Sequence, residues 1–357
     1  MPNIDVRKVQ MVGYSTLSVS LPKDWVKRTG LKAGDAVSVL RQDDGTLKVV
    51  PGAVEEEKPV SRTLHVDAST APRFILRSVV GLYALGVDAI VISNESGLTT
   101  QQVEEAKAAI DRLNGFGVVE QTAKTITLQS FLDPSKFPID GLLQRMRAIT
   151  MYMVDLVCKA LSEGKAEYCR EVKLLETELD KIHWTTLREL LFAARRPDIA
   201  RKIGIGDAYS ITGSRMMIKL AEKVGDAVER MAEFARFFLT MEGGVPGWLL
   251  KHLAEKTAEV AGAYGGAFDA YLTRNLLAAD GFIEASERHQ GSVMPDIRRL
   301  LEGLRKEGGV ASDVDFVSRL HGYVMSLWSL ADMTQTLSEV AMNHSLVEET
   351  PLCSVSL

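Results

Sequence analysis

Two short stretches decide the fold of the larger part of this chain: LETELDK at residues 175–181 and LAEKVGDAVE at residues 220–229. Each contains a Glu-x-x-x-Asp pattern, which occurs only twice in the sequence, as Glu176/Asp180 and Glu222/Asp226. A spacing of four residues places both carboxylates on one face of a helix, where like charges repel each other. A bound cation would turn that repulsion into stabilisation, so the two stretches predict neighbouring helices with four acidic side chains at one spot.

The surrounding residues continue this helical pattern over 138–345, after the Asp133-Pro134 and Pro138 boundary. Breaks at Arg196-Pro197, at residues 243–246 and at Gly308-Gly309 divide the region. The predicted helices cover residues 140–162, 164–194, 205–241, 248–279, 280–306 and 312–343. They form two sets of three with the same order and similar lengths. We therefore expect tandem three-helix bundles over 138–242 and 246–345, in the manner of a duplicated unit.

Upstream of the helical region, residues 60–130 alternate between strand and helix patterns. The predicted order is β-α-β-α-β-β, which is typical of a small α/β sandwich. Gly115-Phe116-Gly117 follows a helix rather than a strand, so it is not a phosphate-binding loop. The pattern favours a spacer or a dimer-forming module.

The first 52 residues have a β-rich pattern, with one short helix between Pro22 and Gly30. They carry eight Lys/Arg and five Asp/Glu, a net charge of +3, whereas the remainder has 34 and 42, a net charge of −8. A polar linker at 55–59 follows. The chain is thus predicted to have a small basic head on an acidic body.

Composition sets the class of protein. The 357 residues are 46% hydrophobic and 25% charged, as in ordinary globular chains, and they exclude a fibrous or disordered protein. Three cysteines without a CxxC pattern exclude a disulfide framework and a cysteine zinc finger. The N-terminus has no signal-peptide pattern, and Arg77 and Asp88 interrupt the most apolar stretch. The sequence predicts a cytoplasmic protein without membrane insertion.

The run from Arg7 to Pro51 resembles the AbrB/SpoVT family of swapped-hairpin DNA-binding modules. The resemblance rests on SLPKDW at 20–25, GLKAGDAV at 30–37 and DGTLKVVP at 44–51. It implies an obligate dimer, and 50 residues bury too little apolar surface to be secure alone. It also implies DNA as a partner, since clustered cations bind phosphates independently of sequence. The candidate DNA-binding residues are Arg7, Lys8, Lys23, Lys27 and Arg28. The alternative is a head that only dimerises the protein.

The four carboxylates of the Glu-x-x-x-Asp pairs offer oxygen ligands suited to magnesium, manganese or iron. Glu176 and Asp180 lie within an apolar stripe, and carboxylates are seldom buried without a partner. The second pair shares its stripe with Glu229 and Glu233, which is also consistent with a solvated acidic surface. We predict a metal site formed by Glu176, Asp180, Glu222 and Asp226, for a divalent or trivalent ion: iron, magnesium, manganese or zinc.

The same motifs resemble the PhoU family of phosphate-uptake regulators, whose tandem three-helix bundles carry Leu-Glu-Arg-Ile-Gly-Asp where this chain has residues 221–226. Together with the head, the chain resembles archaeal PhoU-like proteins that carry an AbrB-type domain. The resemblance implies metal clusters on the acidic motifs and a role in phosphate homeostasis. The partners it implies are DNA, a second copy of the chain, and components of a phosphate transporter or a signalling protein.

The second three-helix set departs from this pattern. Its last helix keeps Asp332, but Trp328 stands at the glutamate position. The preceding helix lacks Glu-x-x-x-Asp and contains Pro295, which predicts a disturbed helix unless it ends there. We therefore expect no complete second metal site and a packing role for Trp328.

A helical bundle with carboxylates can also be a di-iron oxidase, which uses Glu-x-x-His motifs on two helices. Asp180-Lys181-Ile182-His183 is a single variant copy of such a motif. The sequence contains no Ser-His-Asp, Cys-His or P-loop pattern either. We therefore expect a protein that is not an enzyme, with His183 as a hydrogen-bonded core residue. A third interpretation is a pure interaction protein that modulates a phosphate transporter.

Overall fold

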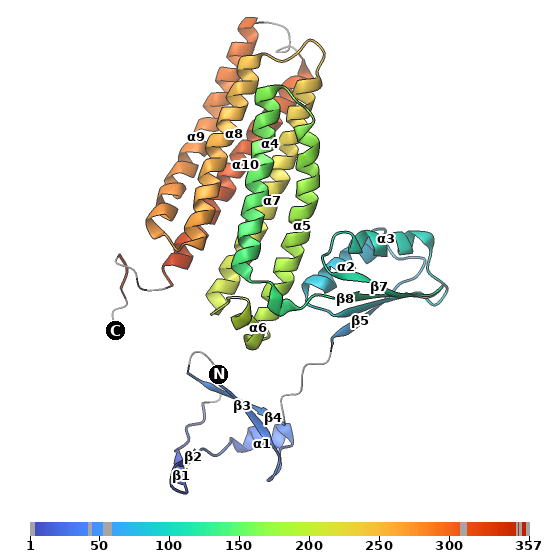
Figure 1. The fold of residues 1–357 in the computed structure, drawn as a ribbon, viewed down its shortest axis with the longest axis vertical. Helices are drawn as coiled ribbons and strands as arrows, with labels where there is room; N and C mark the ends of the chain where they lie inside the picture. The colour runs from blue at the N-terminus through green and yellow to red at the C-terminus, as the bar shows by residue number, and fades with distance from the viewer. Residues whose placement is uncertain are drawn as a thin grey trace. The chain divides into compact units, whose positions relative to one another are not determined.

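A computed structural model describes residues 4–41, 45–52, 59–307, 313–347, 349 and 352–354. It divides the chain into two units, Met1–Pro59 and Val60–Leu357, which are described separately below (Figure 1). The first unit is the head. The second contains the α/β module and the helical region.

The head consists of two hairpins around one short helix. Strands β1 (Gln10–Val12) and β2 (Thr16–Ser18) pair antiparallel, as do β3 (Val37–Arg41) and β4 (Leu47–Pro51). Helix α1 (Lys23–Thr29) ends at Gly30, whose φ of 70° is the left-handed conformation that glycine adopts at low cost. Among the residues described between 4 and 52, none is buried. The head therefore has no core of its own within one chain.

The α/β module has the predicted order, which is confirmed. Its elements are β5 (Ser61–His65), α2 (Phe74–Ala84), β6 (Ala89–Ser93), α3 (Thr100–Ile110), β7 (Phe116–Gln121) and β8 (Thr125–Ser130). The sheet order is β5-β6-β8-β7, with β5 parallel to β6 and the other pairs antiparallel. Alternating residues of the strands, such as Ile90 and Ile92, are fully buried beneath the helices. Thr99 is the N-cap of α3 and forms a capping box with Gln102.

The rest of the second unit is helical, as predicted, after a single 3₁₀ turn at Pro134–Lys136. The helices are α4 (Ile139–Glu163), α5 (Tyr168–Ala193), α6 (Pro197–Lys202), α7 (Ala208–Thr240), α8 (Gly247–Leu272), α9 (Leu276–Glu307) and α10 (Val314–Ser345). No helix of the described ranges is long and apolar enough to cross a membrane.

Three sequence predictions about these helices were wrong. The short α6 was not predicted, because Pro197 indicated a break without revealing that it also begins a helix. The boundary predicted at 279–280 lies instead at residues 273–275, where Arg274 has a φ of 50° and the Asn275 side chain accepts a hydrogen bond from the amide of Ala278. Helix α9 also continues through Pro295. Packing of Val293 and Leu300 into the core compensates for the backbone hydrogen bond that proline cannot donate.

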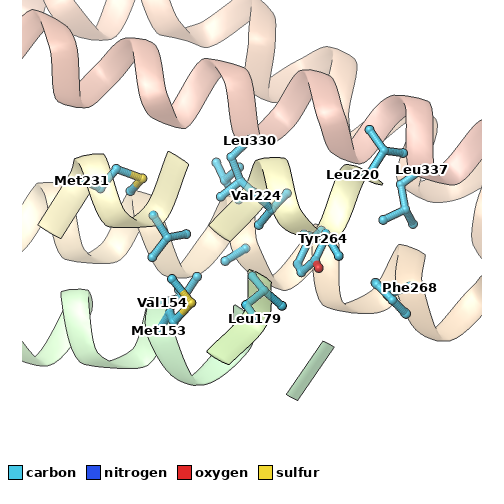
Figure 2. Packing of buried hydrophobic residues seen from close by; sticks show 14 of the residues in the cluster. Met153, Val154, Leu179, Leu220, Val224, Met231, Tyr264, Phe268, Leu330 and Leu337 are labelled. Atoms are coloured by element: carbon cyan, nitrogen blue, oxygen red, sulfur yellow. The ribbon is translucent and has the colours of Figure 1, made fainter. Parts of the chain in front are cut away.

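Both three-helix sets contribute to one continuous core (Figure 2). Met153, Leu179 and Val224 belong to the first set, and Tyr264 and Leu330 to the second. Helix α4 contacts α8, and α7 contacts α10. Buried hydroxyl pairs connect α4 to α8 and α8 to α10, at 3.0 Å between Thr150 and Tyr264 and 2.7 Å between Thr257 and Tyr323. The six long helices, with the short α6 beside them, therefore form a single body rather than two separate bundles.

Candidate functional site

Helices α5 and α7 run antiparallel and come very close where the two Glu-x-x-x-Asp motifs lie. Gly225 of α7 faces Leu179 of α5, and a Cβ at position 225 would come within 2.3 Å of the Leu179 side chain. One helical turn beyond, Nδ1 of His183 lies 3.3 Å from the carbonyl oxygen of Ile218. The glycine of the second motif thus allows the two helices to approach more closely than any other residue would permit.

This approach brings carboxylates of the two motifs close enough to influence each other. Burial, together with Asp180, Glu229 and Asp226, raises the pKa of Glu176 to about 7. Burial, together with Glu222 and Asp226, raises the pKa of Asp180 to about 6. Asp226 of α7 therefore acts on both carboxylates of α5, and Glu222 acts on Asp180. Crowded, partly buried acidic groups are the arrangement that a cation relieves.

Basic side chains provide compensation in the structure as it stands. Lys223 contacts Asp226 at 2.7 Å and Glu222 at 3.6 Å, and Lys219 contacts Glu222 at 2.7 Å. Within the described ranges, no three His, Cys, Asp or Glu side chains are arranged so that they could hold a metal ion. The metal site therefore stays a prediction. If a metal ion binds there, Glu176, Asp180, Glu222 and Asp226 would hold it, and it would take over the neutralisation that Lys219 and Lys223 now provide.

Two further charged residues belong to this cluster and were missed as site residues. Glu229 lies one turn beyond Asp226 and contributes to the raised pKa of Glu176. Arg112, which follows α3 in the α/β module, opposes the raised pKa of both Glu176 and Asp180. Glu229 could have been assigned to the cluster from its i,i+3 spacing to Asp226. Arg112 could not, because no local sequence pattern connects it with residues more than 60 positions away.

His183 is a core residue, as predicted. It is 4% exposed, and its ring meets Trp184 edge-on with 5.0 Å between the ring centroids. Burial lowers the pKa of His183, against the opposing effect of the nearby Glu222. A neutral, hydrogen-bonded imidazole fits a structural role.

In the second three-helix set, Trp328 packs against the core and Asp332 is exposed, in agreement with the predicted packing role of the tryptophan. Glu284, on the neighbouring α9, is paired with Arg288 at 3.6 Å.

The candidate DNA-binding residues are all exposed. Lys23, Lys27 and Arg28 project from α1, and the first two are one turn apart on the same side. Arg7 is paired with Asp5 at 2.5 Å, while Lys8 precedes β1. The side chains of α1 therefore provide the larger block of available positive charge.

These features define a class of protein: a small basic β head, an α/β module, and a helical body with an acidic cluster in its first half. Residues 10–57 match the family described as "Antidote-toxin recognition MazE, bacterial antitoxin". Residues 143–235 match the PhoU domain, and this range includes both Glu-x-x-x-Asp motifs. The chain carries a MazE/AbrB-like domain at its N-terminus and a PhoU domain in its helical region.

Among solved structures, PhoU from Pseudomonas aeruginosa aligns with 58% of this chain and 94% of its own length, at 16% identity and a TM-score of 0.47. No curated protein matches the chain in sequence. The archaeal source that the sequence resemblance implies stays a prediction.

Proposed function

We propose that this protein is a DNA-binding regulator of phosphate uptake, whose helical region receives a signal through the acidic cluster of α5 and α7. The observation that carries the proposal is the presence of a MazE/AbrB-like head and a PhoU domain on one chain. The PhoU domain supports a role in phosphate homeostasis. The MazE/AbrB-like head connects that role to DNA. Both domain classes are regulatory, and we propose no catalytic activity.

The exposure of apolar side chains in the head supports a dimeric head. Met11, Leu17, Val39 and Leu47 are between 54% and 69% exposed in the single chain. Hairpins that carry so many exposed apolar residues gain stability only by burying them against another surface. A second copy of the head offers the same complementary hairpins and satisfies this requirement symmetrically.

Dimerisation would also double the positive charge available for DNA. In each copy, Lys23, Lys27 and Arg28 lie on a single seven-residue helix, α1. Contacts from such a cluster to phosphate release counterions and give affinity that falls with salt. In this proposal the head supplies DNA binding, and the helical region supplies regulation through a metal ion or through contact with transporter components.

The test measures the affinity of the full-length protein for duplex DNA across a salt series. The variant K23A/K27A/R28A should weaken binding and flatten the dependence of affinity on salt. A matched control, K251A/R288A/R299A, removes the same charge from exposed positions of the helical region and should bind as the parent does. Equal binding by the parent and the α1 variant would favour the other interpretation, in which the head only dimerises an interaction protein.

A further inference from the structure

A separate hollow lies along the same two helices, toward the start of α5 and the end of α7. Its volume is about 290 Å³, close to the lower end of the range for ligand pockets, which begins at roughly 300 Å³. The small side chains of Cys169 and Ala232, 7% and 1% exposed, are on its floor. Small residues at facing positions of two packed helices leave a depression where larger ones would fill the groove.

Three basic side chains line this hollow: Arg170, Lys173 and Arg236. They are exposed, and none of the ion pairs found within the described ranges involves them. By contrast, Lys219 and Lys223 on the same α7 helix are each bound to a carboxylate at 2.7 Å. Lys173 lies close enough to Glu229 to oppose the rise in the pKa of that carboxyl, so the three cations surround the depression together with acidic groups. Three cations around one depression attract an anion.

Two carboxylates, Glu229 and Glu233, line the same hollow. An ionised carboxylate only accepts hydrogen bonds, so it repels an anion that carries no proton. A tetrahedral oxyanion that carries a proton can donate that proton to the carboxylate while its other oxygens accept from Arg and Lys. At neutral pH inorganic phosphate carries at least one proton and sulfate carries none. A lining that combines these cations and carboxylates therefore suits phosphate better than sulfate.

We propose that this hollow, formed by Arg170, Lys173, Arg236, Glu229 and Glu233, binds inorganic phosphate. This assignment rests on the proposed function for its biological meaning. It adds the small molecule that the helical region would detect. Glu229 also influences the acidic cluster, where it acts on Glu176.

The experiment titrates inorganic phosphate into the full-length, metal-free protein by isothermal calorimetry, without DNA. We expect saturable binding by the parent, at least tenfold weaker binding by R170A/R236A, and at least tenfold weaker binding of sulfate by the parent. The variant E233Q should reduce the preference for phosphate over sulfate, because an amide can donate to either ion. R145A/R215A, which removes two exposed arginines from α4 and α7 outside the hollow, is the matched control and should bind phosphate as the parent does.

Several outcomes would overturn the assignment. They are the absence of phosphate binding, equal binding of sulfate, and an equal loss in the control variant. Binding of O-phosphoserine without binding of inorganic phosphate would assign the hollow to a phosphorylated partner instead. Circular dichroism of each variant verifies its fold, and K173M replaces R170A/R236A if that pair does not fold. Because DNA is absent from the titration, failure of the head to bind DNA would not change the result. DNA binding is measured separately, in the salt series described above.

Discussion

Gly225 of α7 and Leu179 of α5 are in direct contact, and a Cβ at position 225 would come within 2.3 Å of a methyl carbon of the leucine. Both residues lie inside Glu-x-x-x-Asp motifs, each immediately before the aspartate. The contact that brings the two helices together therefore lies within the same two motifs that supply the carboxylates. Any change that separates the helices at this point also separates Asp180 from Asp226.

Gly225→Ala should destabilise the protein by about 1–3 kcal/mol, because the added methyl overpacks the contact with Leu179. Urea unfolding of the parent and the variant measures the difference in free energy. Gly262→Ala is the control, since this exposed glycine of α8 has no atom within 4 Å of the position of a Cβ. That change should stabilise the helix by up to about 1 kcal/mol through helix propensity. Equal effects at both positions would contradict the role assigned to Gly225.

Much of this architecture was predictable because it depends on the local periodicity of the sequence. The apolar period of the helices and the i,i+4 carboxylates depend on residues within one or two turns, and both three-helix sets were found in this way. The long-range features were not predictable. The sharing of one core by Met153 and Tyr264, and the position of Arg112 near Glu176, depend on how distant segments pack. Pro295 misled the prediction because tertiary packing overrides a local helix-breaking tendency.

Arg188 connects the α/β module to the helical region, and its replacement should be costly. Its guanidinium is 2% exposed and donates to the carbonyl oxygens of Tyr83 and Val87 at 2.8 and 3.0 Å. Those carbonyls belong to the C-terminal end of α2 and its following turn, where the last carbonyls of a helix have no donors within the helix. The amide of Gly86 also donates to the carbonyl of Tyr83, at 2.9 Å. Arg188→Met should therefore destabilise the protein by about 3 kcal/mol and speed amide hydrogen exchange in α2.

Arg195→Met is the matched control for this prediction. Arg195 donates to the neighbouring carbonyl of Leu85 at 2.9 Å, but its side chain is exposed. The loss should be below about 1 kcal/mol, because water can replace the exposed donor. If the two variants lost similar amounts of unfolding free energy, the burial of Arg188 would not explain its contribution to stability.

Glu189 should make the stability of the protein depend on pH. Neither carboxyl oxygen has a hydrogen-bond partner, the residue is 0% exposed, and burial raises the pKa of its carboxyl to about 8. Because this pKa exceeds the unfolded value, the folded state binds the extra proton. The stabilising contribution is complete below the unfolded pKa and is lost as pH rises through about 8, by about 1.4 kcal/mol per pH unit in between.

The measurement compares unfolding free energies of the parent and Glu189→Gln between pH 5 and 9. The parent should lose stability relative to the variant as pH rises, and the difference should level off above about pH 8. Glu178→Gln, on the exposed side of the same helix, should run parallel to the parent over this range. Parallel curves for Glu189→Gln as well would mean that this carboxyl does not carry the proton in the folded state.

The last prediction concerns metal in the acidic cluster of α5 and α7. Mutual repulsion among Glu176, Asp180, Glu222 and Asp226 is relieved by a cation, so a metal ion should raise the melting temperature of the parent by mass action. At a free metal concentration a hundredfold above the dissociation constant, the gain is about 2.7 kcal/mol. Magnesium, manganese, iron and zinc are each added to protein that has been treated with a chelator.

Asp180→Asn/Asp226→Asn should abolish this metal-dependent gain and reduce the metal content found by elemental analysis. In the absence of metal the variant should be at least as stable as the parent, because the amides carry no charge to repel Glu176 and Glu222. The variant loses the ion pair between Asp226 and Lys223, but the lysine side chain is 47% exposed and its ammonium group keeps Glu222 within 3.6 Å. Asp332→Asn is the internal control: it is exposed on α10, Trp328 occupies the place of its acidic partner, and metal content should not change. If the double variant retains as much metal as the parent, the four carboxylates form a solvated acidic face that the lysines neutralise, and the ion is bound elsewhere.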